Sequence, residues 1–242
     1  MSANCPTQAV ILAAGSGTRL RPITNDIPKC MVEVGGRPLL EHTVRWLASF
    51  GVSDLVINLH HRGNVISDYF ADGGKWGVRI TYSHEPEVQG TAGALRNLSG
   101  LLDGPFLVWY GDNLSKCSID RLWESHRASS ALVTIAVHYR DDPTSSGIVA
   151  LDDDDRILRF REKPARGDVF SHWVSAGIMA VEQRVLDAIP RDGKPDWGRD
   201  VLPSMLATGE TLHAYRLSSN ENLMWIDTAE DLDRVRAAWV GA

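Results

Sequence analysis

A short turn near the start of the chain combines glycines, hydroxyl groups and an arginine. It follows an apolar run at residues 9–13 and reads Leu12-Ala13-Ala14-Gly15-Ser16-Gly17-Thr18-Arg19-Leu20. Glycines let backbone N–H groups approach phosphate oxygens closely, and an arginine fork suits phosphate. The turn lacks the third glycine of a dinucleotide fingerprint and the lysine of a Walker A loop. The spacing therefore favours a phosphate-binding loop, with a plain strand-to-helix turn as the alternative.

Three more charged residues follow prolines or apolar runs. Lys29 follows Pro28 in a loop, Asp112 closes the apolar run at 106–110, and Asp227 follows the run at 223–226. Two carboxylates from distant segments can hold one Mg²⁺ ion. The alternatives are an exposed loop lysine and aspartates that cap turns or helices.

The elements that must position these residues alternate between strand and helix. We expect strands at 9–13, 54–59, 80–83, 106–110 and 132–139, and helices at 38–50, 65–70, 92–98 and 119–128. Pro38 suits the first turn of its helix, and Gly51 suits its end. Repeated β-α-β units predict an α/β fold with a parallel sheet and helices on both faces.

The pattern changes after residue 139. We expect a hairpin from strands at 147–151 and 157–161, joined by a solvated turn of four aspartates at 152–155. The rest of the chain is expected to form strands at 173–181, 212–216 and 223–227 and helices at 184–189, 200–207 and 230–239. No linker-like stretch divides the chain, so we expect one domain over residues 1–242.

Composition excludes several classes of protein. The chain has 242 residues, 43% hydrophobic and 23% charged, and a net charge of −6, which argues against a nucleic-acid binder. The first six residues have no basic region of a signal peptide, and no apolar run near the start reaches the roughly 18 residues of a membrane helix. The three cysteines lack a Cys-x-x-Cys pair. We therefore expect a cytoplasmic protein without membrane or nucleic-acid partners.

The glycine turn followed by Pro28-Lys29 resembles the signature of the sugar-1-phosphate nucleotidyltransferases, the nucleotide-sugar pyrophosphorylases. The resemblance runs almost from end to end, and the shorter motifs stand together in family order. They are Gly90-Thr91-Ala92-Gly93-Ala94-Leu95, Gly111-Asp112-Asn113, Gly147-Ile148-Val149, Glu162-Lys163-Pro164, Ala176-Gly177-Ile178, Asp200-Val201-Leu202-Pro203 and Trp225-Ile226-Asp227.

The resemblance implies a Rossmann-like mixed, mostly parallel sheet and a reaction of NTP with a sugar 1-phosphate, giving NDP-sugar and pyrophosphate with Mg²⁺. Residues 1–139 would bind the nucleotide and residues 140–242 the sugar phosphate. Arg19, Lys29, Asp112 and Asp227 would be catalytic, and the two aspartates would hold the metal. The nucleotide would be bound by Leu12, Ala14, Gly15, Ser16, Gly17, Thr18, Arg19, Glu85, Gly90 and Thr91. Gly147, Glu162, Lys163 and Ser175 would bind the sugar phosphate.

Glu85 suggests which base is bound. Uridylyl and thymidylyl relatives carry a glutamine five residues before the glycine that matches Gly90, and an amide both donates and accepts. An ionised glutamate only accepts, which suits the adjacent N1–H and 2-amino donors of guanine. We therefore expect GTP, with a backbone reader and a solvent-facing Glu85 as the alternative.

The sugar is read from weaker signals. Ser175 replaces an asparagine common before Ala-Gly-Ile, and the short chain resembles the D-glycero-D-manno-heptose 1-phosphate guanylyltransferases. A mannose-1-phosphate guanylyltransferase and a uridylyl or thymidylyl transferase acting on a hexose 1-phosphate are the alternatives. A phosphocholine-type cytidylyltransferase lacks Glu-Lys-Pro, and a catalytically silent regulator tends to lose the charged residues kept here. Assembly of the chain into a homo-oligomer is a further possibility.

Overall fold

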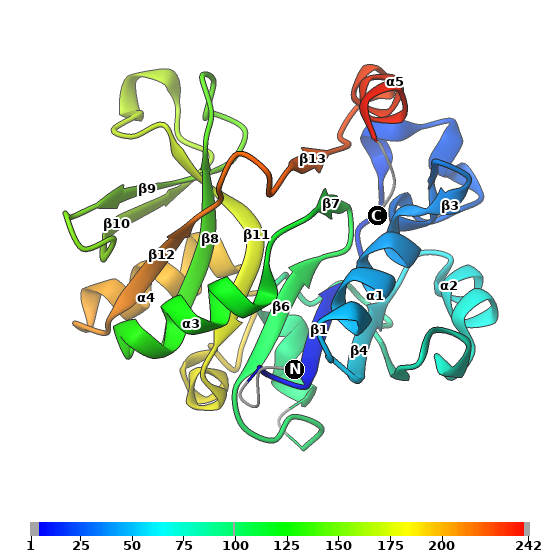
Figure 1. Cartoon of the computed structure of the whole chain (residues 1–242), viewed down its shortest axis with the longest axis horizontal. Helices are drawn as coiled ribbons and strands as arrows, with labels where there is room; N and C mark the ends of the chain where they lie inside the picture. Colours follow the sequence, from blue (N-terminus) through cyan, green and yellow to red (C-terminus); the bar gives the residue numbers. More distant parts are fainter. Residues whose placement is uncertain (1–4, 99, 240–242) are drawn as a thin grey trace. The chain divides into compact units, whose positions relative to one another are not determined.

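The computed structural model describes residues 5–98 and 100–239 and contains two compact units (Figure 1). Unit 1 comprises the described parts of residues 1–88, 109–119 and 220–242, and unit 2 those of residues 89–108 and 120–219. The units interleave along the chain, whereas the predicted halves at 1–139 and 140–242 are consecutive. The single domain over 1–242 stays a prediction. Residues 1–4 of the N-terminal segment, which is not expected to be a signal peptide, lie outside the described residues.

Unit 1 is built on three parallel strands with β4 in the middle. Strands β1 (Gln8–Leu12) and β5 (Arg79–His84) flank β4 (Asp54–Leu59). Most residues of β1 and β4 are apolar and buried, as expected of strands that are covered on both faces. In the register, Leu12 lies opposite Asn58, and Asn58 lies opposite Ser83. The carboxyl ends of all three strands therefore meet at one edge.

Helix α1 (Leu39–Ser49) is one residue shorter at each end than the helix predicted at 38–50. Pro38 at its N-cap has extended backbone, and Gly51 after its end has a φ of +84°. That left-handed conformation costs glycine little and stops the helix. The other described elements of unit 1 are η1 (Thr18–Leu20), η2 (Ile23–Asn25), η3 (Lys29–Met31), β2 (Glu33–Val34), β3 (Arg37–Pro38), α2 (Gly63–Phe70), η4 (Gly74–Trp76), β7 (Asn113–Ser115), β13 (Leu223–Trp225) and α5 (Ala229–Ala238).

A small hydrophobic core joins the turn after β1 to the C-terminal segment within unit 1. It gathers apolar side chains from η1, η3 to β2, α1, β7 and α5. Leu20 adjoins Arg19, and Ile226 adjoins Asp227, so burial of these two apolar side chains fixes the backbone beside two charged residues. Its buried members are Leu20, Val32, Val34, Leu39, Leu114, Ile226, Leu232, Val235 and Trp239.

Unit 2 has mixed strand pairing. Strands β9 and β10 form the predicted hairpin, β11 pairs antiparallel with β8 and β9, and β12 pairs parallel with β8. In the acidic turn, Asp152 Oδ1 accepts hydrogen bonds from the N–H groups of Asp154 and Arg156, at 3.0 and 2.8 Å. The strands are β8 (Val133–Tyr139), β9 (Gly147–Leu151), β10 (Ile157–Glu162), β11 (Trp173–Val181) and β12 (Leu212–Arg216). Strand β6 (Phe106–Tyr110) contributes residues to both units.

Parallel strands in unit 1, mixed pairing in unit 2 and intervening helices confirm the predicted α/β fold with a mixed sheet. Some predicted helices are wrong in type. The helices predicted at 92–98 and 184–189 are 3₁₀ turns instead, η5 (Gly93–Leu98) and η7 (Gln183–Ala188). Ile189 is extended before Pro190, which stops η7 after six residues. Helix α3 (Ile119–Ser129) matches its prediction, whereas α4 (Leu202–Ala207) follows a π-helical turn, η8 (Trp197–Val201), and η6 (Arg166–Asp168) is a further 3₁₀ turn.

Within the described residues, Cys5, Cys30 and Cys117 form no disulfide. No helix within residues 5–98 and 100–239 is long and apolar enough to cross a membrane.

Candidate active site

Strand pairing brings Asp112 and Asp227 to the same place in unit 1. Strand β13 runs antiparallel to β7, and Trp225 lies opposite Asn113. Asp112 immediately precedes Asn113, and Asp227 follows Trp225 by two residues. Gly111 donates its N–H to the carbonyl oxygen of Leu12 at 2.9 Å, which places this corner beside the end of β1.

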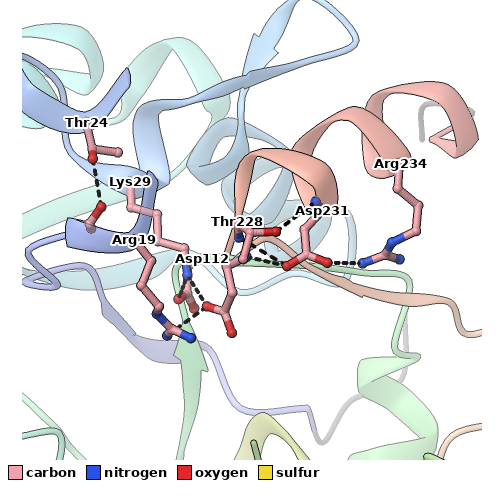
Figure 2. A network of polar contacts seen from close by, with 9 residues as sticks. Arg19, Thr24, Lys29, Asp112, Thr228, Asp231 and Arg234 are labelled. Carbon is pink, nitrogen blue, oxygen red and sulfur yellow. Dashed lines mark hydrogen bonds and ion pairs between the residues drawn. The ribbon is translucent and has the colours of Figure 1, made fainter. Parts of the chain in front are cut away.

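Lys29 joins the two carboxylates. Its Nζ lies 2.6 Å from Asp112 Oδ2 and 2.9 Å from Asp227 Oδ1. Arg19 Nη2 lies 3.0 Å from the same Asp227 oxygen. Figure 2 shows Arg19, Lys29 and Asp112 converging on one point. The four predicted catalytic residues therefore form one ionic network, although they come from four segments of the sequence.

Asp227 does not cap helix α5, which was the alternative to its role at the site. Thr228 is the N-cap: its hydroxyl accepts from the N–H of Asp231 at 3.2 Å, and the Asp231 carboxylate accepts from the N–H of Thr228 at 3.1 Å. This capping box satisfies the first turn of the helix. The Asp227 carboxylate is thereby left to face Lys29 and Arg19.

Asp227 and Lys29 keep their charges at neutral pH. Burial alone would raise the pKa of Asp227, but Lys29 and Arg19 outweigh it and lower that pKa. Burial alone would lower the pKa of Lys29, but Asp112 and Asp227 outweigh it and raise that pKa. The neighbouring Cys30 stays a neutral thiol, because burial and then Asp112 raise its pKa to about 12.

The glycine turn packs against the side chain of Lys29 at Gly17. Gly17 has a φ of +59°, and a Cβ atom there would lie 3.1 Å from Lys29 Cβ and from Thr24 Cγ2. The buried Thr24 donates its hydroxyl to Gly17 O at 2.7 Å. Around Gly15, by contrast, a Cβ atom would meet nothing within 4 Å. Leu12 ends β1, Ala14 is buried, and Gly15, Ser16, Thr18 and Arg19 are exposed.

Glu85 is buried rather than turned to solvent, with 7% of its surface exposed. Its Oε1 accepts from Asn58 Nδ2 at 2.8 Å, and Asn58 Oδ1 accepts from the N–H of Ala13 at 2.6 Å. The solvent-facing alternative for Glu85 is therefore wrong. One amide connects the predicted base reader to the start of the glycine turn.

In unit 2, two glycines make room for the Glu162 carboxylate. Gly147 lies opposite Glu162 in the β9–β10 hairpin. A Cβ atom would lie 2.7 Å from Glu162 Oε2 if placed on Gly147, and 2.5 Å if placed on Gly198. Burial, and then the charge of Asp196, raises the pKa of Glu162 although Lys163 and Arg199 oppose them.

Lys163 has an unusual backbone for a residue that precedes proline. Its φ is +44°, a left-handed conformation that costs a non-glycine residue about 1 kcal/mol or more. Its N–H donates to Ser146 O at 3.1 Å, and its Nζ lies 3.8 Å from Glu162 Oε1. Ser175, in β11, accepts the N–H of Gly177 at 3.2 Å.

Gly90 and Thr91 also belong to unit 2, where they contact the segment at 194–197. Gly90 has a φ of +84°, and a Cβ atom there would lie 2.5 Å from Lys194 O. The Thr91 hydroxyl donates to Asp196 Oδ2 at 2.6 Å and accepts from the N–H of Trp197 at 3.0 Å. These contacts explain both residue types structurally, and a role in nucleotide binding stays a prediction.

The donor set of Asp112 and Asp227 fits a magnesium ion. Mg²⁺ binds hard oxygen ligands, and commonly one or two carboxylates together with substrate phosphates. Both carboxylates already contact one ammonium group, so this point is suited to positive charge. Within the described part of the chain, no group of three or more His, Cys, Asp or Glu side chains could hold a metal ion by itself.

Sequence reasoning missed Asn58 and Asp196. Asn58 interrupts the otherwise apolar, buried run at residues 55–59 of β4, and that interruption was a signal that could have found it. Asp196 accepts from the N–H groups of Gly198 and Arg199, at 3.0 and 3.1 Å, as well as from Thr91. No local spacing in the sequence connects position 91 to position 196.

Comparison with known proteins identifies the family of the chain. A family model described as "Nucleotidyl transferase" matches residues 8–235. The chain is 33% identical over 234 residues to a UTP–glucose-1-phosphate uridylyltransferase of Synechocystis, which covers 91% of this chain and 59% of the relative. It is 33% identical over 232 residues to the mannose-1-phosphate guanylyltransferase of Mycobacterium tuberculosis, and the match covers 95% of this chain and 63% of that relative. The chain thus spans roughly three-fifths of the length of these curated relatives.

Solved structures show the same fold. HddC from Yersinia pseudotuberculosis superposes with a TM-score of 0.80 at 25% identity, covering 95% of this chain and 98% of that one. A putative glucose-1-phosphate thymidylyltransferase from Bacillus anthracis gives a TM-score of 0.83 at 24% identity, covering 95% and 94%.

Proposed function

The chain belongs to the nucleotidyl transferase family, and on this premise we propose that it is a sugar-1-phosphate guanylyltransferase. One observation carries the proposal: Arg19, Lys29, Asp112 and Asp227 form one charged network beside a glycine turn at the end of a parallel strand. Ligands of open α/β sheets bind at such strand ends. Two cations and two carboxylates suit a reaction in which two anionic phosphates must meet.

The reaction is an in-line displacement at the α-phosphorus of the NTP. A phosphate oxygen of the sugar 1-phosphate forms the new P–O bond, and the bond to pyrophosphate breaks. Arg19, which is exposed, binds the β- and γ-phosphates and the departing pyrophosphate. Lys29 neutralises charge on the α-phosphate. Catalysis then rests on positioning and on charge stabilisation, without a covalent enzyme intermediate.

Asp112 and Asp227 would hold Mg²⁺ together with phosphate oxygens. When bound, the ion supplies charge neutralisation at phosphorus. When the metal binds, the Lys29 ammonium must move from the two carboxylates to a phosphate group. The long lysine side chain allows this movement.

Lys163 and Glu162 bind the sugar phosphate in this proposal. Lys163 contacts the phosphate, and its strained backbone supports a functional role. Glu162 accepts hydrogen bonds from sugar hydroxyls, and Gly147 lets the sugar approach the backbone. Ser175, which is shorter than an asparagine, favours D-glycero-D-manno-heptose 1-phosphate over a simple hexose.

The buried carboxylate of Glu85 supports GTP. It accepts from two adjacent guanine donors, whereas a glutamine amide would set an NH₂ group against one of them at a cost of about 1–3 kcal/mol. Matched relatives at 33% identity include both a uridylyltransferase and a guanylyltransferase, so the side chain at this position is the better guide to the base.

Pyrophosphate release with Mg²⁺ tests the proposal. Five nucleotides (GTP, UTP, dTTP, CTP and ATP) are each paired with the 1-phosphates of heptose, mannose and glucose. We expect GTP with heptose 1-phosphate to be fastest, and Asp227→Ala to lose orders of magnitude in turnover while keeping its melting temperature.

Release from none of these pairs would reject the enzyme and favour a silent regulatory homologue. A preference for UTP or dTTP would reject guanine. Faster pyrophosphate release with mannose 1-phosphate would reject heptose 1-phosphate as the preferred sugar, but it would not reject the reaction or GTP.

A further inference from the structure

Asn58 is a buried polar residue in the otherwise apolar run at residues 55–59 of β4. In β4 it lies between Ile57 and Leu59, and 3% of its surface is exposed. A buried amide destabilises a fold unless its hydrogen-bonding groups are paired. The residue type at position 58 is therefore explained by the bonds that this amide makes.

The two bonds of Asn58 fix the direction of its amide. A backbone N–H can only donate, so the atom that faces Ala13 N at 2.6 Å must be the oxygen. The Nδ2 group then faces Glu85 Oε1 at 2.8 Å and donates to it. The reversed amide would set two donors against each other at Ala13 and two acceptors against each other at Glu85.

We infer that Asn58 is a positioning residue that sets which hydrogen-bonding character residue 85 presents to the base, an inference that rests on the proposed function. Because Asn58 offers a donor, the atom of residue 85 beside it must be an acceptor. The other oxygen of a glutamate is an acceptor too, which suits guanine. A glutamine would be held with its oxygen toward Asn58 and would present its NH₂ group, a donor, to the base instead.

The backbone of Glu85 is anchored as well. Its N–H donates to Leu59 O at 2.8 Å, and His60 Nδ1 lies 2.8 Å from its carbonyl oxygen. The backbone from which the Glu85 carboxylate extends is therefore held in place. Since Asn58 also holds the N–H of Ala13, base reading and the start of the glycine turn depend on one side chain.

Exchanging the polarity of the pair without changing its shape tests this inference. In the variant N58D/E85Q, the carboxylate introduced at position 58 accepts from the N–H of Ala13 and from the amide introduced at position 85, whose oxygen then turns toward the base. Calorimetry with Mg²⁺ gives the Kd of GTP and of UTP for each variant, without any sugar phosphate. We expect E85Q to lower the GTP-over-UTP affinity ratio roughly tenfold to a hundredfold, and N58D/E85Q to regain about tenfold of that loss.

A double variant that melts like the wild type but keeps the low ratio of E85Q would overturn the inference. If the double variant does not fold, N58A decides: it should lower the ratio with Glu85 intact, and an unchanged ratio overturns the inference. Equal wild-type affinity for GTP and UTP also overturns it. Absence of pyrophosphate release in an enzyme that keeps its GTP preference rejects the proposed reaction and leaves the role of Asn58 standing.

Discussion

Lys29 occupies the position between two carboxylates that a divalent cation would also neutralise. Its side chain is only 12% exposed, and its Nζ contacts both Asp112 and Asp227. If the two aspartates hold a metal ion as proposed, the ammonium competes with that ion for the same oxygens in the protein without nucleotide. Nucleotide phosphates would relieve the competition by giving Lys29 another anion.

Replacing Lys29 by methionine should tighten metal binding while it impairs turnover. Loss of one positive charge in direct contact with the carboxylates should improve Mn²⁺ affinity without nucleotide by about tenfold or more. Electron paramagnetic resonance of free Mn²⁺ measures this. Lys163→Met is the matched control, because Lys163 lies in unit 2 and its nearest carboxylate is Glu162 at 3.8 Å. Equal or weaker Mn²⁺ binding by Lys29→Met would contradict the competition.

The sequence allowed the four charged residues to be predicted, but it did not reveal how they interact. Arg19, Lys29, Asp112 and Asp227 stand in short motifs, and the structure brings all four together. That one lysine bridges both aspartates depends on side-chain geometry, which no motif encodes. Asn58 was missed because a single polar residue in a strand has meaning only through partners 45 and 27 residues away.

At the scale of elements, the turn after β1 uses its glycines for different purposes. Gly17 needs its left-handed backbone and packs against Thr24 and Lys29, whereas Gly15 has open space around it. A methyl group on Gly17 would strain the turn, and a methyl group on Gly15 would only occupy space where phosphate is proposed to bind.

Alanine at each glycine should separate folding from binding. Gly17→Ala should lower the free energy of unfolding by about 1–2 kcal/mol, because both the backbone and the 3.1 Å contacts oppose a Cβ atom. Gly15→Ala should melt like the wild type and raise the KM for NTP roughly tenfold, with the KM for sugar phosphate unchanged. Chemical denaturation and steady-state kinetics measure the two effects. An unchanged KM for NTP in Gly15→Ala would remove Gly15 from the phosphate site.

Strand β13 shows what an element-level prediction can and cannot provide. A strand was predicted at residues 223–227 from its apolar run, and the structure has a strand at Leu223–Trp225. Its partner, β7, lies more than 100 residues earlier in the chain, and the pairing register decides that Asp227 meets Asp112. Local propensity carries no information on such a long-range pairing. The same limit explains the 3₁₀ turns, where the predicted segments were too short to distinguish helix types.

At the scale of the whole molecule, the interleaved units reflect the path of the chain. The described part of the segment from residue 220 belongs to unit 1, so the proposed metal ligands Asp112 and Asp227 come from distant parts of the sequence but from one compact unit. Alternation of strands and helices predicted the fold class. It could not predict this return, because the small core that holds it combines residues as distant as Leu20 and Trp239.

The histidines with lowered pKa values all lie in unit 2, which predicts how the protein responds to acid. Burial lowers the pKa of His126 and of His213, and burial and then Arg140 lower that of His138 to about 4. Between pH 6.5 and 4, the unfolded chain binds a proton at position 138 that the folded protein does not. The folded state therefore loses stability as the pH falls through this range, and this loss levels off below about pH 4.

Replacing His138 by glutamine should flatten this dependence, because the unfolded variant has no proton to gain at that position. His138 should account for at most about 3 kcal/mol of the loss in the free energy of unfolding between pH 7 and pH 4. Urea denaturation at several pH values measures that free energy for both proteins. The comparison of slopes is its own control, because any packing cost of glutamine lowers stability equally at every pH. Parallel curves for the wild type and His138→Gln would show that His138 does not resist protonation in the folded protein.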